Sequence, residues 1–600
     1  MQDTSLYKYH TWTVNIRKLK IREKEMELTI RELRTDLIDE GEKFLEEIDT
    51  CSNDPLRTNE DLLLQILHDN RNTEYGRKYG FGGIRSADEY RKKVPLSNYD
   101  DYASYIERMI KKGEHNLITA YNVVQYAVTS GSVGVQKIIP MTEQSMSVYE
   151  ESFFARTTAL ASRYYMQKYG HTLPVGKCLN MLETESYTAE DSTPKGSVSG
   201  AVSGRFRDIF PLLMISPEPV QIPRSNMNMN YMKARFALED SGITFILSAF
   251  MTNIVDMMNY IRSNWEMITD DIEKGTINEN VCDEVSRALI MPYIRKRPKR
   301  AQELRDVFSQ GFDTPIIPRI WKKLTWVCSI GTGSFATYTE KFRKYAGSSI
   351  AIDHFAYAAS EGMFATTVKM NDTRFAPLLK SCFFEFLPAD APEGSNDTLF
   401  LDELEDGKDY EIIITNLSGF YRYRIKDVIR VVGFYNNCPM ITFAYRKSQL
   451  VNVAAEKMTE EHMDEAVRRM KKELNCEFND YAIYVDSEGA VSRYVVLLEP
   501  DHPIPVDAEG IYGEIMGRLF GEVNPEYGIL TKLGSLGRPL VLIQQPQTHA
   551  LWRDLMLMKG VSRNQIKPVR VLDTPMKQRF FFELLEEGQP LPKLPFSKQK

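Results

Sequence analysis

A narrow apolar stripe marks the first part of the chain, between Val14 and Ile48. This stretch is rich in charge and has no glycine or proline before Gly41, and its apolar residues recur at the spacing that a helix places along one side. They are Ile16, Leu19, Ile21, Met26, Leu28, Ile30 and Leu33. Because no heptad pattern is sustained, we expect this helix to pack on the body of the protein rather than to pair with another chain.

Helical windows alternate with short β-rich runs over about residues 60–440, which is typical of an α/β domain. Residues 411–415 (EIIIT), a turn at Ser418–Gly419 and residues 420–425 predict an antiparallel hairpin. A further strand is expected directly afterwards, over residues 428–434.

The pattern changes beyond Arg446. Residues 459–474 predict an amphipathic helix, residues 481–485 and 492–498 predict strands, and residues 510–520 predict a second helix. This alternation suggests a small separate α/β domain. We therefore divide the chain into an N-terminal helical extension (1–55), a large domain (56–445) and a small C-terminal domain (446–600).

Length and charge narrow the class of protein. Six hundred residues exceed what one hydrophobic core organises, so at least two domains are expected. The formal net charge of −7 gives no electrostatic argument for nucleic-acid binding. The basic run at 295–300 (RKRPKR) begins a segment with helical periodicity, and we interpret it as a solvated helix start.

Cysteine and histidine usage points to a reducing compartment. The seven cysteines are scattered without a CxxC pair, and the eight histidines form no HExxH motif, so a disulfide framework and a metal cage made by the protein alone are not expected. The longest apolar run, residues 242–251, is far shorter than the roughly 20 residues that span a bilayer. We expect a cytoplasmic protein that binds neither nucleic acid nor a membrane.

Residues 126–140 (YAVTSGSVGVQKIIP) are the first candidate for chemistry. A strand predicted over 123–128 leads into a loop with glycines, hydroxyls and a lysine, and a helix is predicted from Thr142. Backbone N–H groups, hydroxyls and a helix N-terminus together suit a phosphate. The loop lacks the Gly-Lys-Ser/Thr of a Walker A motif, and a plain turn explains this segment alone equally well. The candidate ligands are Thr129, Ser130, Gly131, Ser132, Gly134 and Lys137.

Two carboxylates follow predicted strands. Glu361, in residues 357–362 (YAASEG), lies where it could hold Mg²⁺ beside a triphosphate. Asp427 ends the run 420–427 (FYRYRIKD), where a carboxylate can accept both hydroxyls of a ribose. A structural explanation exists for each, because Glu361 could cap a helix and Asp427 could pair with Arg424 or Lys426.

Two basic residues lie in or beside the small domain. Arg446 falls at the predicted domain boundary, and Lys567, in residues 564–570 (NQIKPVR), lies near the end of the small domain. Lys567 could equally be a surface residue.

In this order the segments resemble the acyl acid amido synthetases, the family named for the auxin-responsive proteins of plants, which also has bacterial members. The resemblance covers about residues 60–575. Its motifs are TSGSVGVQKIIP (129–140), WVCSIGTGSFATY (326–338), YAASEG (357–362), FFEFLP (383–388), SGFYRYRIKDVIRVVGF (418–434), AYRKSQLVNVAAEK (444–457) and NQIKPVR (564–570). The blocks at 383–388 and 418–434 are the most specific, whereas the serine- and glycine-rich loop is shared by the wider adenylate-forming superfamily.

The resemblance implies a fold and an activity. The fold would be α/β, with a large N-terminal domain of mixed β-sheets flanked by helices and a β-barrel-like part, and a small mobile C-terminal α/β domain. The activity would be ATP-dependent adenylation of a carboxylic acid, followed by acyl transfer to an amino acid amine, which gives an amide, AMP and pyrophosphate. An acyl-CoA ligase and a catalytically impaired binding protein on this fold are the alternatives. The acid, the amine and the oligomeric state stay open.

The resemblance also implies roles for residues of the large domain. The residues of the loop would cradle the phosphates of ATP, with Lys137 as a point charge. Glu361 would coordinate Mg²⁺. Tyr357 could stack near the adenine, with Ser360 as a further nucleotide-binding residue.

Three further roles follow in the same way. Asp427 would fix the ribose, and Arg446 would reach phosphate or ribose oxygens from the hinge between the domains. Lys567 would neutralise the α-phosphate during adenylation.

Three positions depart from the family pattern. Val133 removes a hydroxyl from the loop, Lys426 stands where the pattern has glycine before the aspartate, and Ala455 replaces the glycine of Gly-Glu-Lys. The chain is therefore interpreted as a divergent member.

The acyl pocket is expected among residues 235–256 and around 331–335, with Met251, Met257 and Met258 as candidate lining. Plain hydrophobic core is an equal alternative for this apolar helix.

Overall fold

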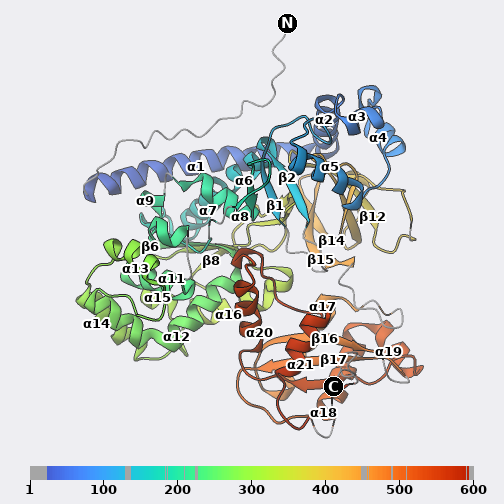
Figure 1. Cartoon of the computed structure of the whole chain (residues 1–600). Coiled ribbons are helices and arrows are strands. Elements are labelled where there is room, and N and C mark those ends of the chain that lie inside the picture. Colours follow the sequence, from blue (N-terminus) through green and yellow to red (C-terminus); the bar gives the residue numbers. More distant parts are fainter. Residues whose placement is uncertain are drawn as a thin grey trace. The chain divides into compact units, whose positions relative to one another are not determined.

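The computed structural model describes residues 23–592, except 129–136, 183, 185–186, 208–209, 223–226, 393, 448–455, 457, 488–490, 508–509 and 590. The described residues form two compact units (Figure 1). The larger unit contains described residues up to 128, together with 137–425 and 430–442, and the smaller unit contains 426–429 and 443–592. The N-terminal helix thus belongs to the larger unit. The continuous part of the smaller unit begins at residue 443, whereas the sequence predicted a boundary at 446.

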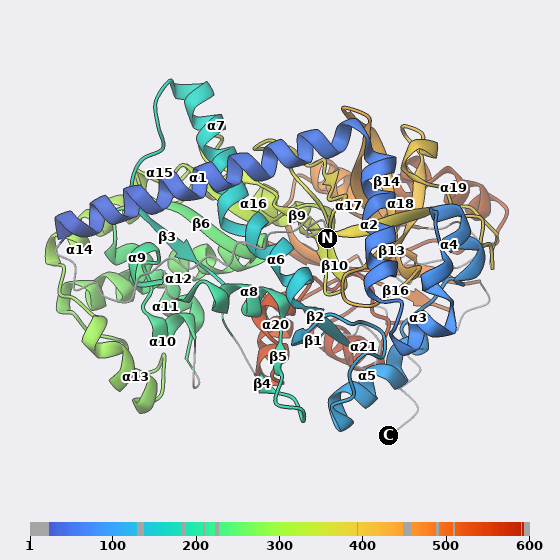
Figure 2. The same cartoon turned by 90° about the horizontal axis from the view of Figure 1, so that it is seen from above.

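A long first helix, α1 (Glu23–Asn53), lies along the larger unit (Figure 2). It packs against a π-helical turn (Ser152–Arg156) and helix α7 (Thr157–Tyr169). Its buried residues lie along one side and include Ile30, Leu33, Leu37, Leu45 and Ile48. The expectation that this helix packs on the body of the protein is confirmed.

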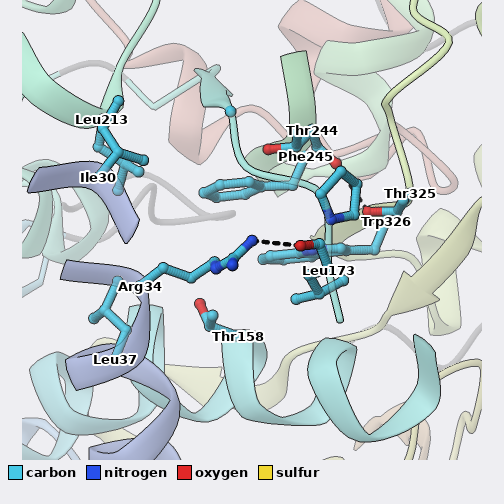
Figure 3. A pocket seen from close by; sticks show the side chains of 12 residues that line it. Ile30, Arg34, Leu37, Thr158, Leu173, Leu213, Thr244, Phe245, Thr325 and Trp326 are labelled. Carbon is cyan, nitrogen blue, oxygen red and sulfur yellow. Dashed lines mark hydrogen bonds between the residues drawn. The ribbon is translucent and has the colours of Figure 1, made fainter. Parts of the chain in front are cut away.

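Arg34 of α1 reaches into a small cavity of about 30 Å³ at the N-terminal ends of two strands (Figure 3). Its guanidinium donates to the backbone oxygen of Leu173 at 2.5 Å, beside the stacked rings of Phe245 and Trp326, whose centroids are 4.5 Å apart. Burial, followed by the charge of Arg31, lowers the pKa of Arg34. This contact ties α1 to the segment between α7 and β3.

The core of the larger unit surrounds a parallel sheet. Its strands are β3 (Lys177–Asn180), β6 (Ile243–Phe250), β7 (Trp326–Ile330) and β8 (Ala351–Asp353), in the order β3-β6-β7-β8. The main helices of this core are α11 (Met229–Glu239), α12 (Met251–Lys274), α14 (Pro298–Phe308) and α16 (Ala336–Ala346). Met251, Met257 and Met258 of α12 are fully buried in this core. Of the two interpretations, acyl pocket or plain hydrophobic core, the structure supports hydrophobic core for these three residues.

The serine- and glycine-rich loop joins two strands rather than a strand and a helix. Strand β1 (Val123–Val128) is confirmed, but β2 (Ile138–Thr142) pairs with it antiparallel, with Val128 opposite Ile138. Helix α6 (Glu143–Glu151) begins only after β2. The helix predicted from Thr142 is therefore confirmed, but the strand before it was not predicted; it forms because the apolar residues after Lys137 gain a backbone partner in β1. Strands β5 (Pro194–Gly196) and β4 (Tyr187–Thr188) complete the sheet β2-β1-β5-β4.

The predicted hairpin is present in a four-stranded sheet. Its strands are β12 (Cys382–Pro388), β13 (Asp409–Asn416), β14 (Tyr423–Tyr435) and β15 (Cys438–Arg446), in chain order. The two segments predicted over 420–425 and 428–434 are one long strand, β14. A smaller sheet holds β9 (Ala356–Ala359), β10 (Gly362–Thr366) and β11 (Ala376–Pro377). The described strands form no closed sheet, so the β-barrel-like part stays a prediction.

Short helices complete the larger unit. They are α2 (Pro55–Asp69), α3 (Glu74–Lys78), α4 (Ala87–Lys93), α5 (Asp100–Lys112), α8 (Val198–Arg205), α9 (Phe210–Leu213), α10 (Glu218–Gln221), α13 (Glu284–Ile290) and α15 (Ile317–Ile320). Within the described part of the chain, no helix combines the length and the apolar character that crossing a membrane requires.

The smaller unit is the predicted α/β fold. Thr459 caps helix α17 (Glu460–Leu474) by accepting from the backbone N–H of His462. The sheet β16-β17-β18 consists of Phe478–Asp486, Arg493–Pro500 and Leu540–Ile543. The other helices are α18 (Ile511–Val523), α19 (Pro525–Lys532), α20 (Thr548–Met558) and α21 (Pro575–Glu583). The predicted helices and strands of this region are confirmed.

A buried ion pair links the two most specific sequence motifs. Arg422, just before β14, donates from two guanidinium nitrogens to Glu385 of β12 at 2.9–3.1 Å, and their side chains are 2% and 1% exposed. Arg422 also donates to the backbone oxygens of Arg91 and Val94 at 2.7 and 2.8 Å. The motifs at 383–388 and 418–434 therefore share a structural contact, whatever their role in the reaction.

The turn before β14 requires a glycine. Gly419 has a φ of +99°, and a Cβ built on it would lie 2.9 Å from the backbone oxygen of Ile118. We expect Gly419→Ala to destabilise the larger unit by about 2–3 kcal/mol, since a clash adds to the backbone strain. Gly433 is a matched control, because its φ is +97° but a Cβ there meets nothing within 4 Å.

Gly433→Ala should therefore cost about 1 kcal/mol, from the backbone alone. Urea denaturation of both variants measures the difference. Equal losses would contradict the close approach to Ile118.

Candidate active site

Glu361 lies in a tight hairpin turn. Strands β9 and β10 pair antiparallel, with Ala359 opposite Gly362, so Ser360 and Glu361 form the turn between them. The side-chain amide of Asn416, at the end of β13, donates to the backbone oxygen of Glu361 at 2.6 Å. The turn is thus held from the neighbouring sheet, and Glu361 does not cap a helix.

Lys137 and Glu361 meet at one tyrosine hydroxyl. The ammonium of Lys137, just before β2, lies 3.5 Å from the hydroxyl of Tyr423, and this hydroxyl lies 3.5 Å from Oε1 of Glu361. The backbone N–H of Ile138 donates to the hydroxyl of Tyr99 at 2.9 Å, and the Lys137 ammonium lies 5.4 Å from the centre of that ring. The larger unit therefore brings together two predicted residues that are more than 200 positions apart in the sequence.

Tyr99 and Tyr423 were missed by sequence reasoning as parts of this site. Burial and the nearby charge of Glu361 raise the pKa of Tyr99, so it stays a neutral hydroxyl. Tyr423 falls within the run FYRYRIKD that suggested a ribose contact, but nothing in that run indicates which tyrosine reaches Glu361. Only the tertiary structure, which brings parts of three separate sheets together here, shows which tyrosine it is.

Two further predicted residues, Tyr357 and Ser360, lie just before Glu361 in the chain. Tyr357 of β9 is buried, at 8% exposure, with its ring centre 5.3 Å from that of Phe364. Ser360 is half-buried in the turn beside Glu361. Thr129, Ser130, Gly131, Ser132 and Gly134 lie outside the described residues, as do Val133 and Ala455.

Asp427 and Arg446 form an ion pair within the smaller unit. Nε and one terminal nitrogen of Arg446 donate to the two carboxylate oxygens of Asp427 at 2.5 and 3.1 Å. The Asp427 side chain is 3% exposed and that of Arg446 is 28% exposed. Arg424, one of the partners considered for Asp427, makes a two-point ion pair with Glu411. A ribose bound to Asp427 would have to compete with Arg446 for the same oxygens.

Lys426, which stands where the family pattern has glycine, adopts a left-handed backbone conformation. Its φ is +68°, and its side chain is exposed. This conformation costs an L residue about 1–2 kcal/mol, whereas glycine adopts it readily.

We therefore expect Lys426→Gly to be more stable than Lys426→Ala by about 1 kcal/mol, since alanine keeps the strain and glycine removes it. Urea denaturation compares the two variants, both of which lack the lysine side chain. Equal stability would show that the strand does not hold this residue in the left-handed region.

Lys567 is exposed in the smaller unit, after the 3₁₀ turn Arg563–Gln565. Arg570, in the same motif, has a structural role. Arg570 is buried and pairs with Asp480, and its backbone oxygen accepts from the N–H of Ile483 at 2.8 Å. This anchors the segment on β16 three residues after the lysine.

The described residues fit a Mg²⁺ ion that is held jointly by the protein and by the phosphates of the nucleotide. Among the described residues, no group of three His, Cys, Asp or Glu side chains could hold a metal ion by itself. Mg²⁺ in nucleotide sites is commonly held by one or two carboxylates together with substrate phosphates. Glu361, placed in a turn beside the cation Lys137, fits that pattern.

A buried ion pair at the C-terminal edge of the parallel sheet was not predicted. Arg156 donates to Asp353, at the end of β8, at 2.7 Å, and both side chains are fully buried. Complete burial would raise the pKa of Asp353, but the charge of Arg156 and hydrogen bonds from Thr157 and Thr367 lower it. Ligands in α/β sheets bind at this edge. No motif in the sequence marked either residue.

The fold is that of an acyl acid amido synthetase. The solved structure of the GH3.15 acyl acid amido synthetase superposes with a TM-score of 0.77 at 21% identity, covering 92% of this chain and 98% of that one. A second structure of that protein is in complex with 2,4-DB and gives the same values.

Three domains of one family match in chain order. The GH3 family N-terminal domain matches residues 44–351, the central domain residues 375–446, and the C-terminal domain residues 461–576. The chain therefore belongs to the GH3 family.

Two named relatives illustrate the family. Jasmonoyl-L-amino acid synthetase GH3.5 of Oryza sativa subsp. japonica is 26% identical over 76% of this chain and 82% of its own length. Indole-3-acetic acid-amido synthetase GH3.3 of Arabidopsis thaliana is 25% identical over 86% of this chain and 89% of its own length.

Proposed function

We propose that this protein activates a carboxylic acid with ATP and then transfers the acyl group to the amine of an amino acid. The products are an amide, AMP and pyrophosphate. Membership of the GH3 family supports this proposal, and the two named relatives form amides between an acid and an amino acid. The acid and the amino acid used by this chain are left for experiment.

The contact of Lys137 and Glu361 through the Tyr423 hydroxyl is the observation that carries the proposal. In adenylation a carboxylate oxygen attacks the α-phosphorus, so two anions must meet and a third leaves. Catalysis of such a step is mostly positioning and charge neutralisation. Lys137 would hold a phosphate, and Tyr423 would orient both charged groups before ATP binds.

Glu361 would hold Mg²⁺, which when bound would neutralise charge on the phosphates. The carboxylate stays available because the turn is held by its backbone oxygen, through Asn416, rather than by its side chain. Tyr357 and Ser360 would lie at the nucleotide, and the residues of the loop 129–136 would supply further donors to the phosphates.

Residues of the smaller unit would act on the same nucleotide. Asp427 would accept the ribose hydroxyls, which frees Arg446 to reach a phosphate or ribose oxygen. Lys567 would approach the α-phosphate during adenylation, as its exposed position allows. We place the reaction in the cytoplasm, because all seven cysteines are unbridged thiols.

Exchange of pyrophosphate into ATP, measured with a broad panel of carboxylic acids, tests the first half-reaction. Acid-dependent exchange is expected with at least one member. Product analysis with amino acids and with CoA as competing acceptors then tests the second half-reaction. Absence of exchange with the whole panel would favour a binding protein, and a thioester without an amide would favour an acyl-CoA ligase.

Lys567→Ala should slow adenylation more than it slows amide formation from preformed acyl-adenylate. The reason is that an anionic carboxylate attacks the α-phosphorus itself only in the first step, whereas in the second step the amine attacks the acyl carbonyl. Single-turnover measurement of each half-reaction separates the two effects. Lys472→Ala, at another exposed lysine of the smaller unit, is the control and should leave both rates unchanged. An equal loss in both steps of Lys567→Ala would refute this role.

A further inference from the structure

A cavity lies in the larger unit beside helix α6. It has a volume of about 240 Å³, is partly open to solvent, and is lined by α1, α2, α6 and the segment between β11 and β12. Its apolar walls include Phe44, Ile48, Leu62, Val148, Leu379 and Leu417. We call it the α1–α6 cavity. Its size and apolar walls suit a small organic molecule.

The α1–α6 cavity and the candidate active site face opposite sides of α6. Gln144, Ser147, Val148 and Glu151 line the cavity, and a helix places residues at this spacing on one face. Tyr149 points the other way, and its hydroxyl donates to the backbone oxygen of Ala359 at 2.8 Å, directly before the turn that holds Glu361. The cavity is thus a separate site with α6 as the shared wall.

The charges of the cavity do not balance. Glu47 of α1 and Lys380 form an ion pair. Glu151 of α6 is exposed toward the cavity, and within the described part of the chain no residue makes a hydrogen bond or ion pair with its carboxylate. Two carboxylates and one ammonium therefore line the cavity, and the carboxylate of Glu151 has no positively charged partner among the described residues.

The surroundings of Glu151 disfavour its charge. Partial desolvation of the carboxylate by the surrounding protein, followed by the charges of Glu47, Glu150 and Glu40, raises the pKa of Glu151 to about 7, although the residue keeps access to solvent. Lys380 acts against this shift but is engaged by Glu47. A cation placed in the cavity would supply the missing partner.

We infer that the α1–α6 cavity binds an organic ammonium ion, a small molecule with an apolar body and a protonated amine that pairs with Glu151. The apolar walls would take the body out of water, and the unpaired carboxylate would select the amine over a neutral or anionic group of similar shape. An anion would meet Glu151 and Glu47 and be repelled.

Calorimetric titration of the full chain with matched amines and alcohols tests this inference. The probes are butylamine and phenethylamine, with butanol, phenylethanol and 3-phenylpropionate as their neutral and anionic counterparts. At pH 8 we expect at least one amine to bind about 10-fold or more tightly than its alcohol. Equal binding of amine and alcohol, or no binding of either amine, would overturn the inference. The titration needs neither ATP nor an acid, so its outcome is independent of the proposed reaction.

Two variants locate the site. Glu151→Gln keeps the shape of the side chain and should abolish the preference for the amine. Glu46→Gln, at an exposed position of α1 next to Glu47, should leave the preference intact. A preserved preference in Glu151→Gln would place the amine elsewhere and overturn the assignment.

The pH dependence gives an independent readout. Only ionised Glu151 would pair with the amine, so affinity should fall about 30-fold between pH 8 and pH 5.5 in the wild type. The dependence should be flat in Glu151→Gln. The pKa of Lys380 is raised by Glu47 despite partial burial, and burial raises the pKa of Cys51, so neither changes its charge in this range. An unchanged pH dependence in Glu151→Gln would contradict the role of this carboxylate.

Discussion

Glu361→Gln should reduce acid-dependent ATP–pyrophosphate exchange by a factor of about 100–1000 while leaving the protein folded. Glutamine keeps the size of the side chain but removes the negative charge that would hold Mg²⁺ against the phosphates. The turn itself should persist, because Asn416 binds the backbone oxygen of residue 361 and not its carboxylate. Exchange rates measured with saturating acid over a range of Mg²⁺ concentrations report the loss.

Two comparisons make this expectation specific. Glu340→Gln changes an exposed glutamate of α16 and should exchange at the wild-type rate. Thermal denaturation of Glu361→Gln should give a midpoint close to that of the wild type. An exchange rate near the wild-type value would remove Glu361 from the site, and a large fall in the midpoint would assign the residue a structural role instead.

Arg422→Met should lower the free energy of unfolding of the larger unit by about 3–5 kcal/mol. The substitution leaves the Glu385 carboxylate, 1% exposed, without its charge partner. It also removes the donors to the backbone oxygens of Arg91 and Val94, which join the start of the larger unit to β14. Urea denaturation followed by circular dichroism measures the loss.

A double-mutant cycle and a surface pair serve as controls. Adding Glu385→Gln to Arg422→Met should cost far less than the sum of the single changes, because the uncompensated charge is then gone. Arg374→Ala breaks the exposed pair with Asp372 and should cost less than about 1 kcal/mol. A loss of that small size for Arg422→Met would show that the buried pair does not hold the two sheet strands and their neighbours together.

Residues 418–434, one of the two most family-specific motifs, contain both residues that hold the fold together and residues of the candidate site. Arg422 faces Glu385 inside the protein, whereas the next residue, Tyr423, faces Lys137 and Glu361. Further along, Lys426 adopts a left-handed backbone conformation and Asp427 meets Arg446. A resemblance carried by residues 418–434 therefore reflects the buried ion pair between Arg422 and Glu385 of β12 as much as nucleotide chemistry.

Local sequence patterns determined much of this protein. The apolar stripe before residue 48 predicted α1, the run 411–425 predicted the hairpin of β13 and β14, and residues 459–474 predicted α17 to within a residue. These elements follow from the period of their own side chains and from caps a few residues away. The resemblance added the family and the candidate residues, but not their contacts.

Only the tertiary structure decided where the candidate residues meet. Ile138–Thr142 is a strand because β1 supplies its backbone partners, and nothing in its own residues predicted that pairing. Lys137 and Glu361 both lie beside the hydroxyl of Tyr423. The carboxylate of Asp427 is paired with Arg446, so in this structure it is not free to accept a ribose. Each of these contacts joins residues separated by 10 to more than 200 positions. Sequence periodicity reports how one segment is buried, but it does not report which distant segment lies against it.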